Sequence, residues 1–183
     1  MTMDRNKVVL VDTQDRALRE IDKMEAHVNG WLHRAFSVFI FNSEGEMLLQ
    51  QRARHKYHGG GLWTNACCSH PRWGEDVKLS AENRLRYEMG ITGKLDFAFS
   101  FIYKAEVENG LTEHELDHVF LGRSDASPLP NPEEVHDFKW QDFDGILRDV
   151  ATNPSGFTHW FRKALPRISE ILDSTLTSDG TPE

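Results

Sequence analysis

Cysteine is scarce in this sequence, and its placement excludes several of its common uses. The chain of 183 residues has two cysteines, Cys67 and Cys68, which are direct neighbours. Adjacent cysteines do not easily close an unstrained disulfide, and no other cysteine is available to pair with either one. A zinc site built from four thiolates is excluded by number. Two free thiols are typical of a reducing compartment, so we expect a cytoplasmic protein.

Long apolar runs and excess positive charge are also missing. The sequence has no run of about 18 apolar residues, and residues 1–20 lack the apolar segment of a secretory signal. We therefore expect neither a membrane span nor export. The 29 acidic residues exceed the 21 Lys and Arg residues, and the net charge of −8 argues against nucleic-acid binding. A few local Lys and Arg residues can still form a site for an anionic small molecule.

The length and the apolar patterning of the chain predict one mixed α/β domain. We expect its core at about residues 8–173 and a loose polar tail at residues 175–183. Apolar and β-branched segments predict strands at 7–11, 35–41, 47–51, 97–103, 116–121 and 136–141. Helical periodicity predicts helices at 78–89 and 155–172, the second of which Pro166 should kink or interrupt.

The segment 63–71 (WTNACCSHP) brings a thiol and an imidazole close together. In an extended segment Cys67 and Cys68 point to opposite faces, and His70 shares the face of Cys68. A free cysteine is more often a small buried hydrophobe than a reactive group. From these residues alone we therefore favour burial of both thiols.

Glu88 occupies an unusual place on the predicted helix 78–89. At about 100° per residue it falls on the apolar arc, which is made by Val77, Ala81, Leu85 and Met89. A carboxylate on a buried face is costly unless it is paired or bound to a metal. Arg84, one turn earlier, can form an i,i+4 ion pair with it, and a bound cation is the alternative.

Carboxylates and histidines elsewhere could form a metal site. Glu113 and Glu115 are two residues apart, so on a strand they point the same way and can share a cation. His27, His33 and His70 would add three imidazoles. Mixed nitrogen and oxygen ligands suit manganese, iron or zinc better than calcium. With nine histidines in the chain, chance pairings are numerous, and each histidine alone is more often a satisfied surface or core residue.

The segment 69–91 resembles a degenerate Nudix box. Leu85, Glu88, Gly90 and Ile91 fit its pattern, as does Glu75. Ser69 replaces the glycine of the box, Asn83-Arg84 replaces an Arg-Glu pair, and Tyr87 replaces a glutamate. Nudix hydrolases use these carboxylates to gather Mg²⁺ ions for attack on a diphosphate. The resemblance therefore implies that hydrolysis is weak or absent.

Further motifs extend this resemblance to most of the chain. Together with segments 32–37 (LHRAFS), 63–65 (WTN), 68–71 (CSHP) and 113–115 (EHE), the box resembles the type I isopentenyl-diphosphate Δ-isomerases, from about Val8 to Trp160. The resemblance implies a Nudix-like mixed β-sheet sandwiched between helices. In that family the alkene of isopentenyl diphosphate is protonated and a proton is lost elsewhere, which gives dimethylallyl diphosphate.

The resemblance also implies roles for individual residues. Cys68 and Glu115 would be the acid–base pair on opposite faces of the substrate, and Tyr103 would hydrogen-bond Glu115. One Mn²⁺ or Zn²⁺ would be held by five residues, namely His27, His33, His70, Glu113 and Glu115. Glu88 would help to bind a Mg²⁺ ion that the diphosphate mainly coordinates. The diphosphate oxygens would meet Lys23, Arg52, Lys56 and Arg84, and Trp160 would cover the alkene.

Two other classes of function are left open by the residues. One is a Nudix-type diphosphohydrolase, against which the lost Arg-Glu pair and the Cys68/His70 pair argue. The other is a non-catalytic metal-binding module in which Cys68 is merely buried. The expected partner is a small diphosphate substrate, and we expect no nucleic acid or membrane partner. The expected oligomeric state is a monomer or a weak homodimer.

Overall fold

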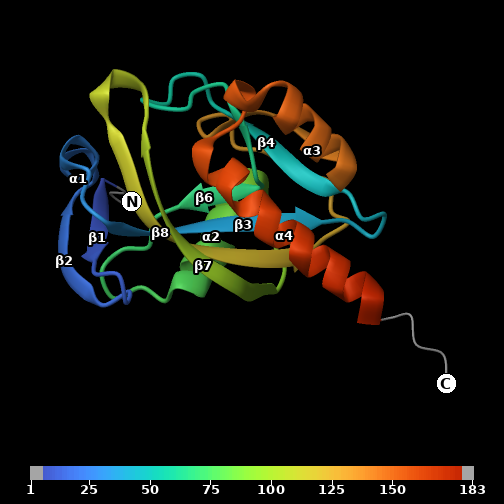
Figure 1. Ribbon diagram of the computed structural model, residues 1–183, viewed down its shortest axis with the longest axis horizontal. Coiled ribbons are helices and arrows are strands. Elements are labelled where there is room, and N and C mark those ends of the chain that lie inside the picture. The colour runs from blue at the N-terminus through green and yellow to red at the C-terminus, as the bar shows by residue number, and fades with distance from the viewer. Residues whose placement is uncertain (1–5, 179–183) are drawn as a thin grey trace.

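The computed structural model describes residues 6–178, with side chains described up to residue 174 (Figure 1). In chain order the elements are β1 (Lys7–Val11), β2 (Ala17–Asp22), α1 (Lys23–Asn29), β3 (His33–Phe41), β4 (Met47–Arg52), β5 (Trp63–Thr64), β6 (Cys67–Ser69), α2 (Val77–Met89), β7 (Leu95–Glu106), η1 (Glu108–Gly110), β8 (Thr112–Arg123), β9 (Val135–Gln141), α3 (Phe143–Thr152), η2 (Pro154–Gly156) and α4 (His159–Ser178). Within residues 6–178, no helix has both the length and the apolar character needed to cross a bilayer.

The central strand of the mixed sheet is β3. It runs parallel to β8, with His33 opposite Glu115, and antiparallel to β6, with Ser37 opposite Cys68. The strands therefore lie in the order β6-β3-β8 at this place, with β7 pairing the outer side of β8. The topology brings Cys68 and Glu115 to strands on the two sides of β3.

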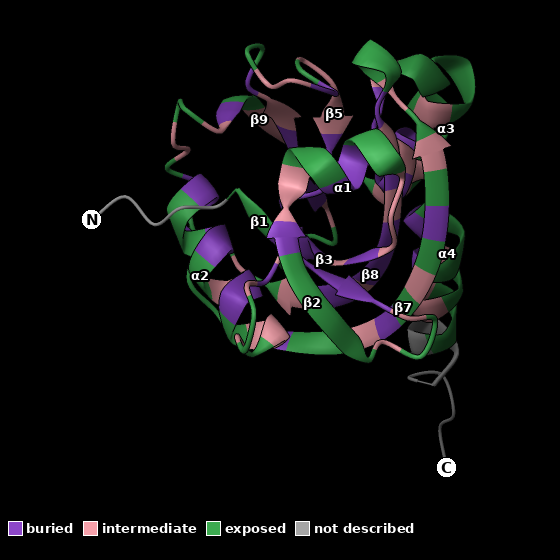
Figure 2. Ribbon diagram, turned by 90° about the vertical axis from the view of Figure 1, so that its left-hand side faces the viewer, coloured by how far each residue is buried: buried purple, intermediate pink, exposed green. Residues whose placement is uncertain are grey.

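The two faces of β3 pack into different apolar cores. Phe39 and Phe41 belong to the core under α3 and α4, whereas Phe36, Val38 and Ile40 belong to the core under α2. Alternation along the strand produces this division, because successive side chains point to opposite faces. Figure 2 shows α2 and α4 on opposite sides of the sheet. The sheet sandwiched between helices, predicted from the sequence, is confirmed.

The helix expected at 78–89 forms as α2 and starts one residue earlier. The Asp76 carboxylate caps its N-terminus by accepting a hydrogen bond of 2.8 Å from the Leu79 amide. Gly90 ends the helix in the left-handed conformation (φ 68°), which a residue with a Cβ adopts only at a cost. Local capping therefore fixes the length of the helix that carries Arg84 and Glu88.

The expected helix 155–172 differs from the observed α4 at both ends. Pro154–Gly156 forms a 3₁₀ turn, so α4 begins only at His159. Pro166 does not interrupt the helix, because the buried stripe around it packs on the sheet and compensates for the lost backbone hydrogen bond. Residues 175–178 continue α4 and are not part of a loose tail, while residues 179–183 of the expected tail lie outside the described residues.

Several elements were not predicted, and one of them, α1, shapes the site. They are β2, α1, α3, the short strands β5 and β6, and the 3₁₀ turns η1 and η2. The Asp22 carboxylate caps α1 by accepting hydrogen bonds from the amides of Met24 (2.9 Å) and Glu25 (3.2 Å), and Gly30 ends α1 at φ 63°. His27 is therefore held on a short helix, and its ring centroid lies 4.9 Å from that of His33.

Candidate active site

A cavity of about 140 Å³ lies over β3 and between β6, β8 and the loop that follows β4. Its lining includes apolar, polar, cationic and carboxylate side chains, several of which come from positions that the sequence had indicated. The indicated residues that line it are Lys23, Arg52, Lys56, Cys68, His70, Arg84, Glu88, Glu113, Glu115 and Trp160. These positions span most of the chain, and the fold brings them to one place.

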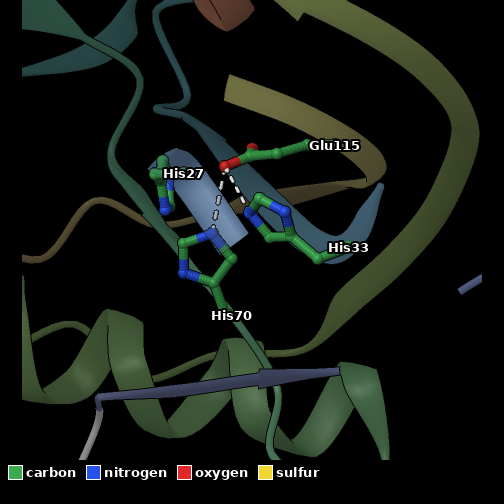
Figure 3. Close-up of side chains that lie close together, drawn as sticks. All are labelled: His27, His33, His70 and Glu115. Carbon is green, nitrogen blue, oxygen red and sulfur yellow. Dashed lines mark hydrogen bonds and ion pairs between the residues drawn. The ribbon is translucent and has the colours of Figure 1, made fainter. Parts of the chain in front are cut away.

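Within the described part of the chain, His27, His33, His70 and Glu115 form a compact cluster (Figure 3). One ligand atom from each lies within 4.8 Å of all the others. The Glu115 carboxylate is central, with its Oε1 atom 3.0 Å from His70 Nε2 and 3.4 Å from His33 Nε2. Three imidazoles and a carboxylate in this arrangement can coordinate one transition-metal ion.

Hydrogen bonds donated to backbone carbonyls orient two of these imidazoles. His27 Nδ1 lies 2.7 Å from the Lys23 carbonyl oxygen, and His33 Nδ1 lies 2.8 Å from that of Trp31. A carbonyl only accepts, so both Nδ1 atoms carry the proton and the Nε2 atoms carry the free lone pairs. Among the described residues these two Nε2 atoms are buried without a hydrogen-bond partner. Oriented, unpartnered nitrogens of this kind fit a metal ion.

The protonation states of His27, His70 and Glu115 also favour metal binding. Burial lowers the pKa of His27, and it lowers the pKa of His70 to about 4 despite the neighbouring Glu115 carboxylate. Burial alone would favour the protonated form of Glu115. Its contacts with His33 and His70 nevertheless hold the pKa of this carboxyl well below its usual range. A neutral imidazole, as at His27 and His70, and a charged carboxylate, as at Glu115, are the forms that bind a metal.

Glu113 lies beside this cluster and has a different partner. Its Oε1 atom is 3.1 Å from Nδ1 of His58, a residue of the glycine-rich loop 57–61. The Tyr103 hydroxyl donates to Glu115 Oε2 at 2.8 Å and to Glu113 Oε2 at 3.3 Å. Burial, followed by the nearby Glu115 carboxylate, raises the pKa of Glu113 well above its usual range. The structure thus groups four of the five expected ligands, and a ligand role for Glu113 stays a prediction.

The two cysteines face opposite sides, as the sequence predicts. Cys67 is fully buried in the core under α2, whereas Cys68 lines the cavity. The Cys68 sulfur lies 3.7 Å from Nη1 of Arg52. Burial raises the pKa of the Cys68 thiol far above its usual value, so the group carries its proton at neutral pH. Burial in the core, which the residues alone favour for both thiols, therefore holds for Cys67, whereas Cys68 faces the cavity.

Arginine and lysine side chains form part of the cavity wall. Arg84 Nη2 lies 2.5 Å from Glu88 Oε1, and the Gln50 amide donates to Glu88 Oε2 at 3.0 Å. The i,i+4 pair is thus formed, and Glu88 lines the cavity as well. The Arg52 guanidinium carbon lies 5.2 Å from the centre of the Trp160 ring.

Trp160 lines the cavity with its ring held in place and already in contact with a cation. Its Nε1 atom donates to Asn65 Oδ1 at 3.1 Å, and the side chain is buried at the start of α4. Arg52 stands against this ring, and such cation–π contacts are worth about 2 kcal/mol or more when desolvated. The position is suitable for stabilising positive charge in a bound molecule.

The sequence missed some residues of the cavity wall. His58, Gln50 and Glu134 line the cavity, and Glu134 contacts both Lys56 and Arg84. No spacing pattern links these residues, because they come from a loop, from β4 and from the segment before β9. Only the glycine-rich character of the loop 57–61 marked the neighbourhood of His58.

The match with known proteins decides the family. The NUDIX domain model matches residues 31–161. An isopentenyl-diphosphate Δ-isomerase of Serratia proteamaculans is 48% identical over 154 residues, which cover 84% of this chain and 86% of that protein. Isopentenyl-diphosphate Δ-isomerase 1 of Aromatoleum aromaticum is 47% identical over 163 residues, which cover 89% of this chain and 92% of that protein. The chain belongs to the isopentenyl-diphosphate Δ-isomerases of the Nudix superfamily.

Solved structures support the same fold. The protein DR0079 from Deinococcus radiodurans aligns with a TM-score of 0.65 at 18% identity, covering 80% of this chain and 89% of that one. A MutT protein from Methanosarcina mazei aligns with a TM-score of 0.64 at 20% identity, covering 76% and 94%. At these identities the likeness shows the fold alone. The Nudix resemblance seen in the sequence is confirmed.

The surviving carboxylates of the Nudix box are used differently in this member of the family. Glu88 faces the cavity, whereas Glu75 accepts hydrogen bonds from the Arg72 amide (2.9 Å) and the Ser80 hydroxyl (3.0 Å) and so ties its own loop to α2. Asn83, Arg84 and Tyr87 supply no carboxylate. A multi-ion hydrolytic centre is therefore incomplete, in agreement with an isomerase.

Proposed function

We propose that the protein interconverts isopentenyl diphosphate and dimethylallyl diphosphate, with Cys68 and Glu115 transferring the protons. Its membership of the Δ-isomerase family favours this reaction over hydrolysis. The observation that carries the assignment is the placing of a protonated thiol and a charged carboxylate on β6 and β8, on the two sides of β3 and in one cavity. Each can then reach a different face of a flat alkene.

The proposed reaction moves one double bond by one position. One group of the pair delivers a proton to the terminal alkene carbon, which leaves positive charge on the tertiary carbon. The other group removes a proton from the adjacent methylene, and those electrons form the new double bond. Protons gained and lost are equal in number, so no further reactant is needed.

The cavity protects the cation that forms in this reaction. Water or a strong nucleophile would capture a tertiary carbocation, so the site must be enclosed. Trp160 contributes an indole face, and the Cys68 thiol is a poor nucleophile while it keeps its proton. Tyr103 hydrogen-bonds the Glu115 carboxylate and restrains it in one orientation.

The metal cluster fits this role. We propose that His27, His33, His70 and Glu115 hold one Mn²⁺ or Zn²⁺, with Glu113 as the further ligand that the sequence indicated. When bound, such an ion would hold the Glu115 carboxylate in place and lower its affinity for a proton. The diphosphate is proposed to bind Lys23, Arg52, Lys56 and Arg84 together with a Mg²⁺ ion that Glu88 helps to hold.

The metal content of the protein tests the cluster. We expect about one tightly held transition metal per chain, and about tenfold or greater loss of metal affinity in His27→Ala, because the oriented Nε2 atom is removed. His55→Ala is the control, since His55 is exposed and outside the cluster. Elemental analysis after exhaustive dialysis measures both. Full turnover of chelator-treated protein in Mg²⁺ alone would remove the cluster from the mechanism.

Glu88→Gln separates a Mg²⁺ role from a structural one. We expect the fold to survive, because Arg84 keeps a carboxylate partner in Glu134 at 3.3 Å, while the Mg²⁺ concentration needed for half-maximal activity rises about tenfold. A melting curve and a Mg²⁺ titration measure the two effects, with Glu82→Gln on the same helix as control. A large fall in melting temperature with an unchanged Mg²⁺ dependence would mean that Glu88 serves only in the structural ion pair with Arg84.

The reaction itself is tested by incubation with isopentenyl diphosphate and Mg²⁺ in D₂O. NMR should show formation of dimethylallyl diphosphate with deuterium incorporated at the exchanging carbons. Release of phosphate from nucleoside diphosphates without isomerisation would favour the hydrolase alternative. Lack of covalent labelling of Cys68 by an epoxide analogue of the substrate would favour the non-catalytic alternative. The cytoplasmic location and the monomeric or weakly dimeric state stay predictions.

A further inference from the structure

The charges on the cavity wall leave little excess positive charge for a diphosphate. Among the described residues, four cationic side chains line the cavity, namely Lys23, Arg52, Lys56 and Arg84. Four carboxyl side chains line it as well, namely Glu88, Glu113, Glu115 and Glu134. The formal charges of these eight side chains cancel when all are ionised. A free diphosphate, which carries several negative charges, therefore finds a poorly matched site.

Glu134 pairs with two of these cations at once. Its Oε2 atom forms an ion pair with Nζ of Lys56, and its Oε1 atom lies 3.3 Å from Nη2 of Arg84. Its side chain is 18% exposed, so water screens these contacts only partly. Burial alone would favour the protonated form of Glu134, but Lys56 and then Arg84 hold the pKa of this carboxyl below its usual value. The group is therefore an anion at neutral pH.

The position of this carboxylate is determined by the backbone on both sides of it. The Glu134 carbonyl accepts a hydrogen bond of 2.9 Å from the Ala53 amide, at the end of β4. The Glu134 amide donates to the Asn131 carbonyl at 3.0 Å. Glu134 thereby links the segment before β9 with α2, through Arg84, and with the loop after β4, through Lys56. The backbone of Glu134 is therefore fixed beside the two cations, while its side chain can still rotate.

We propose that Glu134 is a specificity-determining residue that occupies the phosphate positions on Lys56 and Arg84 in the free protein and makes diphosphate binding depend on Mg²⁺. The inference rests on the proposed diphosphate substrate. A carboxylate with two oxygens on two cations uses the same charge-assisted hydrogen bonds as two phosphate oxygens. Glu134 thus acts as an internal competitor for the anion subsite.

The competition has different outcomes for free and Mg²⁺-bound diphosphate. A free diphosphate that takes Lys56 and Arg84 leaves the Glu134 charge unpaired beside its own negative charge, which costs binding energy. A Mg²⁺-bound diphosphate brings a dication toward which Glu134 can turn, as can Glu88. Since Arg84 Nη2 contacts both carboxylates, at 2.5 Å and 3.3 Å, the two lie on one side of the subsite. The wall therefore selects the Mg²⁺ complex.

Binding of inorganic diphosphate tests the inference without any turnover. Titration calorimetry with full-length protein gives the dissociation constant in the presence of Mg²⁺ and, separately, of excess chelator. We expect Glu134→Gln to bind metal-free diphosphate about tenfold more tightly than the parent protein and to lose most of the enhancement by Mg²⁺. Glu133→Gln is the matched control: it removes the same charge from the neighbouring exposed residue and should behave as the parent.

Other results would overturn the inference. Unchanged or weaker binding of metal-free diphosphate by Glu134→Gln would mean that Glu134 only supports Arg84 and Lys56. If Glu134→Gln lowers the melting temperature strongly, Glu134→Asp keeps the charge but shortens its reach, and it should also bind metal-free diphosphate more tightly. Equal Mg²⁺ dependence in all variants, with normal isomerisation by the parent, would refute the role of Glu134 alone. Absence of diphosphate binding by the parent would refute the proposed substrate as well.

Discussion

Replacement of Cys68 by alanine is expected to lower the turnover of isopentenyl diphosphate by at least about 10³-fold, the range found for loss of a proton-transferring group. The physical reason is that Cys68 presents a protonated thiol to the cavity and alanine can neither give nor take a proton. Substrate binding should change little, because the cationic wall and Trp160 are untouched. Steady-state kinetics with saturating Mg²⁺ gives both values.

Cys67→Ala is the matched control for this experiment. Cys67 is fully buried in the core under α2 and points away from the cavity. Its replacement should cost about 1 kcal/mol of the free energy of unfolding and leave most of the activity. The reverse pattern, with an inactive Cys67→Ala and an active Cys68→Ala, would show that the strand assignment of the two thiols is wrong.

Glu115→Gln should cause a loss of similar size, and it should also remove metal from the protein. The amide keeps the shape of the side chain but cannot accept the proton, and it is a weaker ligand than a carboxylate. Glu115 Oε1 is the atom that lies near both His33 and His70, so the cluster loses its charged member. Turnover and elemental analysis should therefore fall together.

Glu113→Gln provides the comparison on the same strand and the same face. Because Glu113 Oε1 is turned toward His58, we expect this variant to retain more metal than Glu115→Gln. Circular dichroism and a melting curve check that both variants fold. A Glu115→Gln protein with its full metal content and near-normal turnover would exclude Glu115 from both roles.

Much of the fold could be predicted because its main elements have strong local signals. The nearly continuous apolar segment 35–41 predicts a buried strand, and β3 is that strand. The helix α2 has its apolar stripe, an aspartate cap and a terminal glycine, all of which are local features. By contrast, β2 is mostly exposed and α1 has only seven residues, so neither carries enough periodicity to be recognised.

Local sequence patterns indicated only some of the candidate site residues, and the resemblance to a family indicated the others. Cys68 could be separated from Cys67 by strand alternation alone, and Glu88 was marked by its place on an apolar arc. The roles of Tyr103, Lys23 and Trp160 came from the resemblance to a family, because nothing local distinguishes them from ordinary core or surface residues.

The sequence by itself determined the family, the mixed α/β class, the opposite facing of the two cysteines and the oddity of Glu88. Each of these depends on neighbours in the chain or on motifs in order. Only the tertiary structure decided that Glu113 pairs with His58 and that Glu134 holds Lys56 and Arg84. Glu113 and His58 are 55 positions apart, and Glu134 is 50 positions from Arg84 and 78 from Lys56. The fold brings these charges together in one cavity, which no local sequence pattern records.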